Sequence, residues 1–362
     1  IGFITFKTRR AQVTAAQIPI LSQKYPTVTA ISAPARSDII WENMSISTIH
    51  TENAAYMTAI FYYTGLLFWS LVLAFIAVLS DLSTLQRYIP ILQGLNTTSQ
   101  AILEGILPVL IMMLFNMCVH WLMHYTAKDV ERRKTQSSVQ MEVFKWYFMY
   151  QIANVYLLLL AGSIFTTLEE AINNPTSILQ LISSALPSAS IFFLNFIITT
   201  WLAGVPLLLL QLGPTIIYYI YTILLYKPER LTRSMLKNGP FSVYEIEYGT
   251  VIPDILYVLC IVLLYWVISP IITIFACGFF MTTYIAYKYL YMYVAVRPYE
   301  SGGEFFYGIY SYSMTALLTA VVLFITYMGI KQGVWQAPLL LPLIVIIIYV
   351  WRYTEKQYKL LS

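Results

Sequence analysis

Polar side chains recur inside long apolar stretches of this sequence, at spacings that align them on single helical faces. Gln151, Asn154 and Thr166 fall on one such face, and Asn116 lies on another together with His120. Polar groups at membrane depth are costly, and they usually face the interior of a helix bundle or water. These faces therefore predict polar surfaces that point into the helix bundle or toward water.

The most informative stretch is residues 186–226, which is too long for one straight membrane span of about 20 residues. Its polar residues are Ser188, Asn195, Thr199 and Gln211. Two Gly/Pro pairs, which remove backbone donors and predict kinks, are Gly204 with Pro206 and Gly213 with Pro214. A long polar helix that is broken in this way is typical of a helix that lines a permeation path and moves when the path opens. The alternative is a buried packing helix whose polar groups hold it to its neighbours.

Signatures of enzymes are not visible in the sequence, and we expect no catalytic residues and no cofactor or metal. Paired carboxylates, a Gly-rich phosphate loop and a Ser/His/Asp arrangement do not occur at useful spacings. His120 and His124 are four residues apart and could ligate a metal, but no acidic or Cys partner stands nearby in sequence. We interpret them as histidines at the membrane interface. A membrane-embedded enzyme that uses one of them is the weakest alternative.

The composition identifies a polytopic membrane protein of the all-α class. Of the 362 residues, 59% are hydrophobic and 10% are charged, whereas soluble domains carry about 25% charged residues. The three cysteines lie inside apolar runs, so no disulfide framework is indicated. The chain opens with Ile1 in the middle of an apparent strand, so we interpret it as N-terminally truncated.

Eight apolar spans are predicted, near residues 55–80, 104–126, 143–168, 184–222, 250–268, 270–294, 306–330 and 337–352. With residue 1 on the cytoplasmic side, 19 of the 21 Lys and Arg residues fall in inside segments, and the two exceptions are Arg87 and Lys331. Both ends of the chain are therefore predicted to be cytoplasmic. Residues 51–355 form the transmembrane domain, and residues 356–362 form a cytoplasmic tail.

Several further residues are assigned from this topology. Glu104, Glu169 and Glu170 would lie at the outer mouth of a path and concentrate cations there, and ordinary placement at the membrane interface is the alternative. Asn96 begins an Asn-Thr-Thr sequon in an outside loop and is a candidate for glycosylation. Asp254, at the inner end of the fifth span, could pair with the basic inner loops or shape an inner vestibule.

Residues 1–50 differ in character from the rest of the chain. Residues 1–8 alternate like a strand, residues 9–24 are typical of a helix, and residues 27–35 look like a second strand. This order is similar to the second half of an RNA-recognition-type α/β fold, so we predict the C-terminal part of such a cytoplasmic domain and the entry to the membrane. Nucleic-acid binding is not expected, because it needs aromatic stacking positions on a complete sheet.

The whole chain resembles the OSCA family of hyperosmolality-gated, calcium-permeable cation channels, also called calcium-dependent channels. The resemblance begins with GFITFKTRRAQVTAAQ and SDIIWENMSIS, and continues through WYFMYQIANVY, LPSASIFF and WLAGVPLLLLQLGP. The most specific segments are YWVISPIITIF and YKYLYMYVAVRPYESGGEFF, which contain the turn of Glu300, Ser301, Gly302 and Gly303.

The resemblance implies an anoctamin-like helical bundle of about eleven spans, of which eight are present here, usually in a homodimer with one pore per subunit. It implies a mechanically or osmotically gated, non-selective cation channel that passes calcium, sodium and potassium and contacts membrane lipids. Spans one to five would line the pore, with Gly204, Pro206, Gly213 and Pro214 as a gating hinge in the long pore helix. The plasma membrane is the expected location, and an internal membrane is the alternative.

This chain departs from the plant members of the family at three pore positions. It has Leu208 and Gln211 where those members carry an acidic and a basic residue, and Gln151 where their third span begins its pattern with Asn. The alternative function from another class is a phospholipid scramblase, because the same fold and the same polar faces could guide headgroups.

Overall fold

A computed structural model of the chain describes residues 2–17, 30–67, 115–161, 187, 190–225, 245–297, 299, 301, 303–331 and 335–359. Within these residues the chain is helical, and the only β-structure is two isolated bridges, Ile39 with Thr135 and Glu245 with Val296. The N-terminal and central helices are α1 (Arg9–Gln17), α2 (Thr48–Leu67), residues 115–125, η3 (Thr126–Val130) and α6 (Gln136–Ala161). The later ones are η4 (Thr200–Gly204), α9 (Val205–Leu210), α10 (Leu212–Ile220), η5 (Tyr221–Leu225), α12 (Tyr248–Tyr265), α13 (Ile271–Tyr289), η7 (Leu290–Val294), α14 (Glu304–Ile330), α15 (Gln336–Thr354) and η8 (Glu355–Lys359).

Five helices of the described chain are long and apolar enough to cross a membrane. They are Ser190–Leu210, Tyr248–Tyr265, Ile271–Val294, Phe305–Gly329 and Gln336–Tyr358. They match predicted spans four to eight, and the chain is a multi-pass membrane protein of the all-α class. Predicted spans one to three fall on α2, residues 115–125 and α6, and the remainder of each lies outside the described residues.

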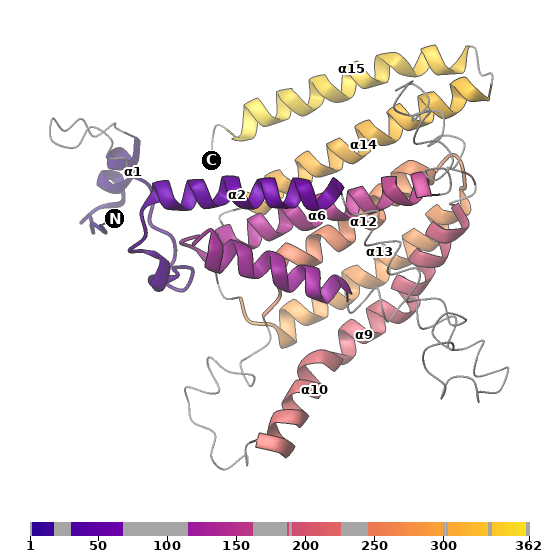
Figure 1. The fold of residues 1–362 in the computed structure, drawn as a ribbon. Coiled ribbons are helices and arrows are strands. Elements are labelled where there is room, and N and C mark those ends of the chain that lie inside the picture. Colours follow the sequence, from indigo (N-terminus) through magenta and orange to yellow (C-terminus); the bar gives the residue numbers. More distant parts are fainter. Residues whose placement is uncertain are drawn as a thin grey trace.

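The helices run alternately up and down through the bundle. The starts of α2, α6, α12 and α14 and the end of α15 lie toward the left of Figure 1, where both labelled chain ends also lie. We call this the inner end. The two chain ends thus lie on one side of the bundle, as the loop charges predict. That this side faces the cytoplasm stays a prediction.

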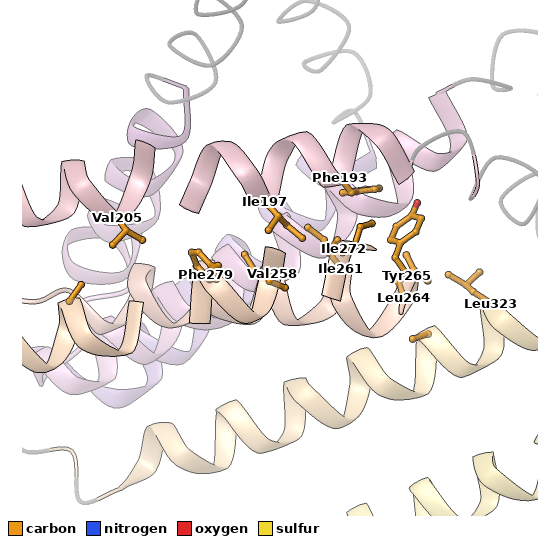
Figure 2. Close-up of a cluster of buried hydrophobic side chains, with 13 residues drawn as sticks. Phe193, Ile197, Val205, Val258, Ile261, Leu264, Tyr265, Ile272, Phe279 and Leu323 are labelled. Carbon is orange, nitrogen blue, oxygen red and sulfur yellow. The ribbon is translucent and has the colours of Figure 1, made fainter. Parts of the chain in front are cut away.

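Apolar side chains between the helices form the core. Phe193 and Ile197, on the helix that begins at Ser190, are fully buried and pack toward Ile261 and Tyr265 of α12 (Figure 2). A second cluster joins residues 115–127 to α2 and α6, and a third joins α6 to α12 and α14. Helix α14 approaches α6 at Gly308, where an added Cβ would lie 2.6 Å from Phe144 Cε1. The core therefore fixes α6 and α12 side by side.

The N-terminal segment agrees with its predicted helix but not with its predicted strands. Helix α1 forms within predicted residues 9–24, whereas residues 2–8 and 30–35 carry no strand assignment. A strand needs a neighbouring strand to pair its backbone groups, and these residues have none within the described chain. The side chains of Phe3, Ile4 and Phe6 are exposed. The RNA-recognition-like domain therefore remains a prediction.

Candidate functional site

A row of polar side chains lies between residues 115–125, α6 and α12 near the inner end. Its members are Asn116, His120, Tyr147, Tyr150, Gln151, Glu247 and Asp254, and we call it the inner polar column. Helical spacing aligns them: Asn116 and His120 are four residues apart, and Glu247 and Asp254 are seven apart, which is about two turns. Three elements therefore present polar faces to one another.

Asp254 forms the centre of the inner polar column. Gln151 Nε2 donates to Asp254 Oδ1 at 2.6 Å, and the Tyr147 hydroxyl donates to the same oxygen at 3.2 Å. The Tyr150 hydroxyl donates to Asn116 Oδ1 at 3.2 Å. The predicted pairing of Asp254 with basic inner loops is therefore not found among the described residues. Its partners are instead the polar face of α6.

At the inner edge of the column, an ion pair joins two helices that are far apart in sequence. His120 Nε2 lies 2.6 Å from Glu247 Oε2 at the N-terminus of α12. This contact lowers the pKa of the Glu247 carboxyl below its ordinary value of 4.5, mainly because the histidine donates a hydrogen bond to the ionised form. The acidic partner for His120 that the local sequence lacks is thus supplied by α12. No group of three metal-ligating side chains is formed within the described residues.

We expect Glu247→Gln to lower the free energy of unfolding by about 0.5 kcal/mol at neutral pH, because the pair is half-exposed and screened. A carboxyl whose pKa is lowered by folding stabilises the protein fully above its ordinary pKa of 4.5 and loses that contribution as the pH falls further. Thermal denaturation in detergent should therefore separate variant and wild type above pH 5 and bring them together near pH 3. Glu245→Gln, an exposed acid two residues away, is the control. A difference that grows in acid would contradict the assignment.

The long helix that carries the second polar face is broken at both predicted positions. Residues 200–204 form a π-helical turn immediately before Pro206, which has no N–H to donate to the carbonyl of residue 202. Gln211 then adopts a left-handed conformation with φ of 48°, and Pro214 leaves the carbonyl of Leu210 without its helical donor. We call residues 190–225 the pore helix, after the role that the resemblance implies for this stretch. Its two Gly/Pro pairs mark its two irregular points.

The polar residues of the pore helix turn away from the core. Asn195 and Thr199 are exposed, whereas Phe193 and Ile197, two residues before each of them, are fully buried. Gln211 is half-buried, and its Nε2 atom has no hydrogen-bond partner in the part of the chain that the structure describes. The pore helix therefore presents one apolar face to α12 and α13 and one polar face outward.

The π-helical turn is seated on α13 through a single aromatic residue. A Cβ added at Gly278 would lie 2.6 Å from Trp201 Cη2, so the indole ring lies directly against the α13 backbone. Trp201 also makes an edge contact with Phe275, with ring centroids 6.4 Å apart. A tight contact thus holds the pore helix at the point where its backbone is least regular.

A second polar cluster lies at the inner end, next to the column. Glu131 is only 1% exposed, accepts a short hydrogen bond from Thr58 of α2 and pairs with Arg133 at 2.7 Å. Arg133 also pairs with Glu142 of α6 at 3.0 Å, and Asn43 donates to the Arg133 carbonyl at 2.9 Å. We call Asn43, Thr58, Glu131, Arg133 and Glu142 the inner clasp. It joins residues 41–43, α2 and α6 through one buried acid.

Several predicted site residues cannot be placed by this structure. Glu104, Thr166, Glu169, Glu170, Ser188, Glu300, Gly302 and the glycosylation candidate Asn96 lie outside the described residues. For Asn154, Gly213 and Pro214 only the helical backbone is described. Gln151 and Asn116 are brought together in the inner polar column, while Asn195 and Thr199 lie on the separate pore-helix face. Gly303 has φ of 88°, as a turn glycine should.

Sequence reasoning missed the tyrosines and Glu247. Tyr147 and Tyr150 are four and one residues before Gln151, so the helical spacing alone could have placed Tyr147 on its face. Glu247 precedes Asp254 by two turns and could have been assigned to the same face of α12. No sequence signal relates either acid to residues 115–125, because the contact depends on how three helices pack.

Comparison with known proteins gives a consistent result over nearly the whole chain. The family described as "Calcium-dependent channel, 7TM region, putative phosphate" matches residues 54–328. Hyperosmolality-gated Ca2+ permeable channel 3.1 of Arabidopsis thaliana is 28% identical over 94% of this chain and 47% of its own length. CSC1-like protein ERD4 of Brassica juncea is 27% identical over 95% of this chain and 47% of its own length. Hyperosmolality-gated Ca2+ permeable channel 1.5 of Arabidopsis thaliana is 25% identical over 99% of this chain and 47% of its own length. The chain thus spans about half the length of these relatives.

Proposed function

Because this chain belongs to the calcium-dependent channel family, we propose that it forms the conducting part of a calcium-permeable, non-selective cation channel. Osmotic or mechanical stress on the membrane gates it, and sodium and potassium also pass. Support for the stimulus comes from the printed names of the relatives, two of which are hyperosmolality-gated channels. The protein works as a homodimer in the plasma membrane. Its family and relatives are described as channels, not as enzymes.

The path runs within the subunit, between α2, residues 115–130, α6, the pore helix and α12. The observation that carries this proposal is the pore helix, which is broken twice and presents Asn195 and Thr199 outward, opposite its packed face. Lipid tolerates irregular backbone only where protein or a water-filled cavity satisfies the freed groups. A helix with two packings of similar energy is also a device that membrane tension can bias.

A lipid scramblase is the second candidate, and one observation favours it. Only 17% of the apolar window of Ser190–Leu210 is buried inside the molecule, so its polar face could open toward the bilayer. An open groove would guide headgroups, whereas a groove sealed by lipid would conduct ions. The scramblase therefore needs this polar face to be open to the bilayer, whereas the channel needs it to be covered.

The deciding experiment uses the purified protein in liposomes. We expect stepped suction on excised patches to evoke discrete cation currents, with little exchange of labelled lipid in the same preparation. Liposomes without protein are the control. Fast lipid exchange without discrete openings would replace the channel by the scramblase, and Asn195 and Thr199 would become headgroup contacts. The absence of both cation currents and lipid exchange would contradict both functions.

A further inference from the structure

Asp254 lies in a membrane-spanning helix and forms no ion pair within the part of the chain that the structure describes. The described ion pairs join His120 to Glu247, Arg133 to Glu131 and Glu142, and Lys145 to Glu142, and none of them includes Asp254. Acidic residues at membrane depth normally pair with a base or face a watery cavity, because an isolated charge in hydrocarbon is costly. Asp254 is exposed within the part of the chain that the structure describes, so a ligand can reach its carboxylate.

A second and independent observation points to a missing ligand at the same place. Gln151 is only 6% exposed, and its Oε1 atom has no hydrogen-bond partner among the residues that the structure describes. Its amide faces Asp254, since Nε2 lies 2.6 Å from Oδ1. A buried acceptor left unpaired costs free energy, which a positively charged ligand would recover. If the amide turns, Oε1 faces the carboxylate, and a small widening of this contact would let one cation touch both oxygens.

We propose that Asp254 and Gln151 form a cation-binding site in the inner part of the conduction path, and that it favours calcium over monovalent ions. The inference rests on the proposed channel function for its role in permeation. Calcium takes six to eight oxygen ligands. Asp254 and Gln151 supply a few of them, the Tyr147 hydroxyl stands next to the site at 3.2 Å from Asp254 Oδ1, and water supplies the rest. Such a hydrated site binds weakly enough for the ion to leave, as conduction requires.

The first test measures reversal potentials under bi-ionic conditions in patches that give tension-evoked currents. We expect Asp254→Asn to lower the permeability of calcium relative to sodium by about fivefold, since the site loses its only formal charge. Asp129→Asn makes the same chemical change at an exposed acid of η3, on the same end of the bundle, and should leave the ratio unchanged. An unchanged ratio in Asp254→Asn would overturn the proposal.

A second variant guards against a folding defect. Gln151→Glu places another carboxylate beside Asp254, so we expect a higher relative permeability to calcium and a smaller unitary calcium current, because the ion stays longer. Loss of folding cannot produce a gain in selectivity. A fall in relative calcium permeability, or no change, would contradict a cation site at these two residues.

A binding assay separates this inference from the proposed function. Terbium, a calcium substitute, emits when tyrosine close to it is excited, and Tyr147 lies beside Asp254. We expect a calcium-displaceable luminescence from the purified protein that Asp254→Asn loses and Asp129→Asn retains. Retained luminescence in Asp254→Asn would overturn the site. Luminescence of the expected kind in a protein that passes no current would leave the site standing and reject the channel.

Discussion

Glu131→Ala is expected to lower the free energy of unfolding by about 3 kcal/mol, the largest loss from any single side chain considered for this protein. Glu131 is fully buried and contacts Thr58 of α2 and Arg133. Within the described residues, its removal leaves the Arg133 guanidinium with Glu142 as its one carboxylate partner and the Thr58 hydroxyl with the Ala55 carbonyl as its acceptor. Because the inner clasp joins residues 41–43, α2 and α6, its loss should also loosen the first spans from the third.

Equilibrium unfolding in mixed micelles measures this effect. Glu52→Ala removes an exposed acid from α2, the helix that Glu131 contacts through Thr58, and should change stability little, so it is the control. Glu131→Gln keeps the shape of the side chain but not its charge. Its free energy of unfolding should lie between those of the wild type and Glu131→Ala. An unchanged free energy of unfolding in Glu131→Ala would show that the buried pair contributes no net stability, as is found for some buried ion pairs.

Replacing Gly204 and Pro206 together with alanine is expected to change the tension threshold of the channel. Alanine at position 206 restores the missing backbone donor, and the two changes favour a straight helix by about 3 kcal/mol. The bent form is the one that the chain adopts here, so the variant moves the equilibrium toward the other packing. A bias of that size changes the open fraction at fixed tension by about 100-fold.

Patch recording under stepped suction tests the hinge. Pro342→Ala is the matched control, because Pro342 is also an exposed proline inside an apolar helix, α15, away from the pore helix. The hinge hypothesis fails if the double variant reaches the membrane at normal levels and opens at the wild-type threshold.

Hydropathy and Gly/Pro placement were sufficient to predict the later spans and the two breaks of the pore helix. Both features are local, because length and apolarity decide whether a helix can span and a missing N–H decides where it breaks. The polar contacts were not predictable in this way. His120 and Glu247 are 127 residues apart, and only the packing of residues 115–125 against α12 brings them together.

The inner clasp shows a related limit of loop charges. Lys128–Lys134 is a basic stretch that the positive-inside rule explains without any specific contact. Arg133 nevertheless turns inward to two carboxylates, and Glu131 is buried in the middle of the stretch. Net loop charge gives the expected orientation of the chain, but it cannot tell a solvated side chain from one that holds helices together.

The seat of Trp201 on Gly278 makes α13 a fulcrum for the pore helix. The arm on the inner side, residues 211–225, is about 22 Å long at 1.5 Å per residue. A change in bend of about 20° at Gln211 would swing the far end of this arm by about 8 Å, while Trp201 itself stays in place. Small forces from the bilayer on an arm of this length would therefore produce a large displacement of its far end near the inner end of the bundle.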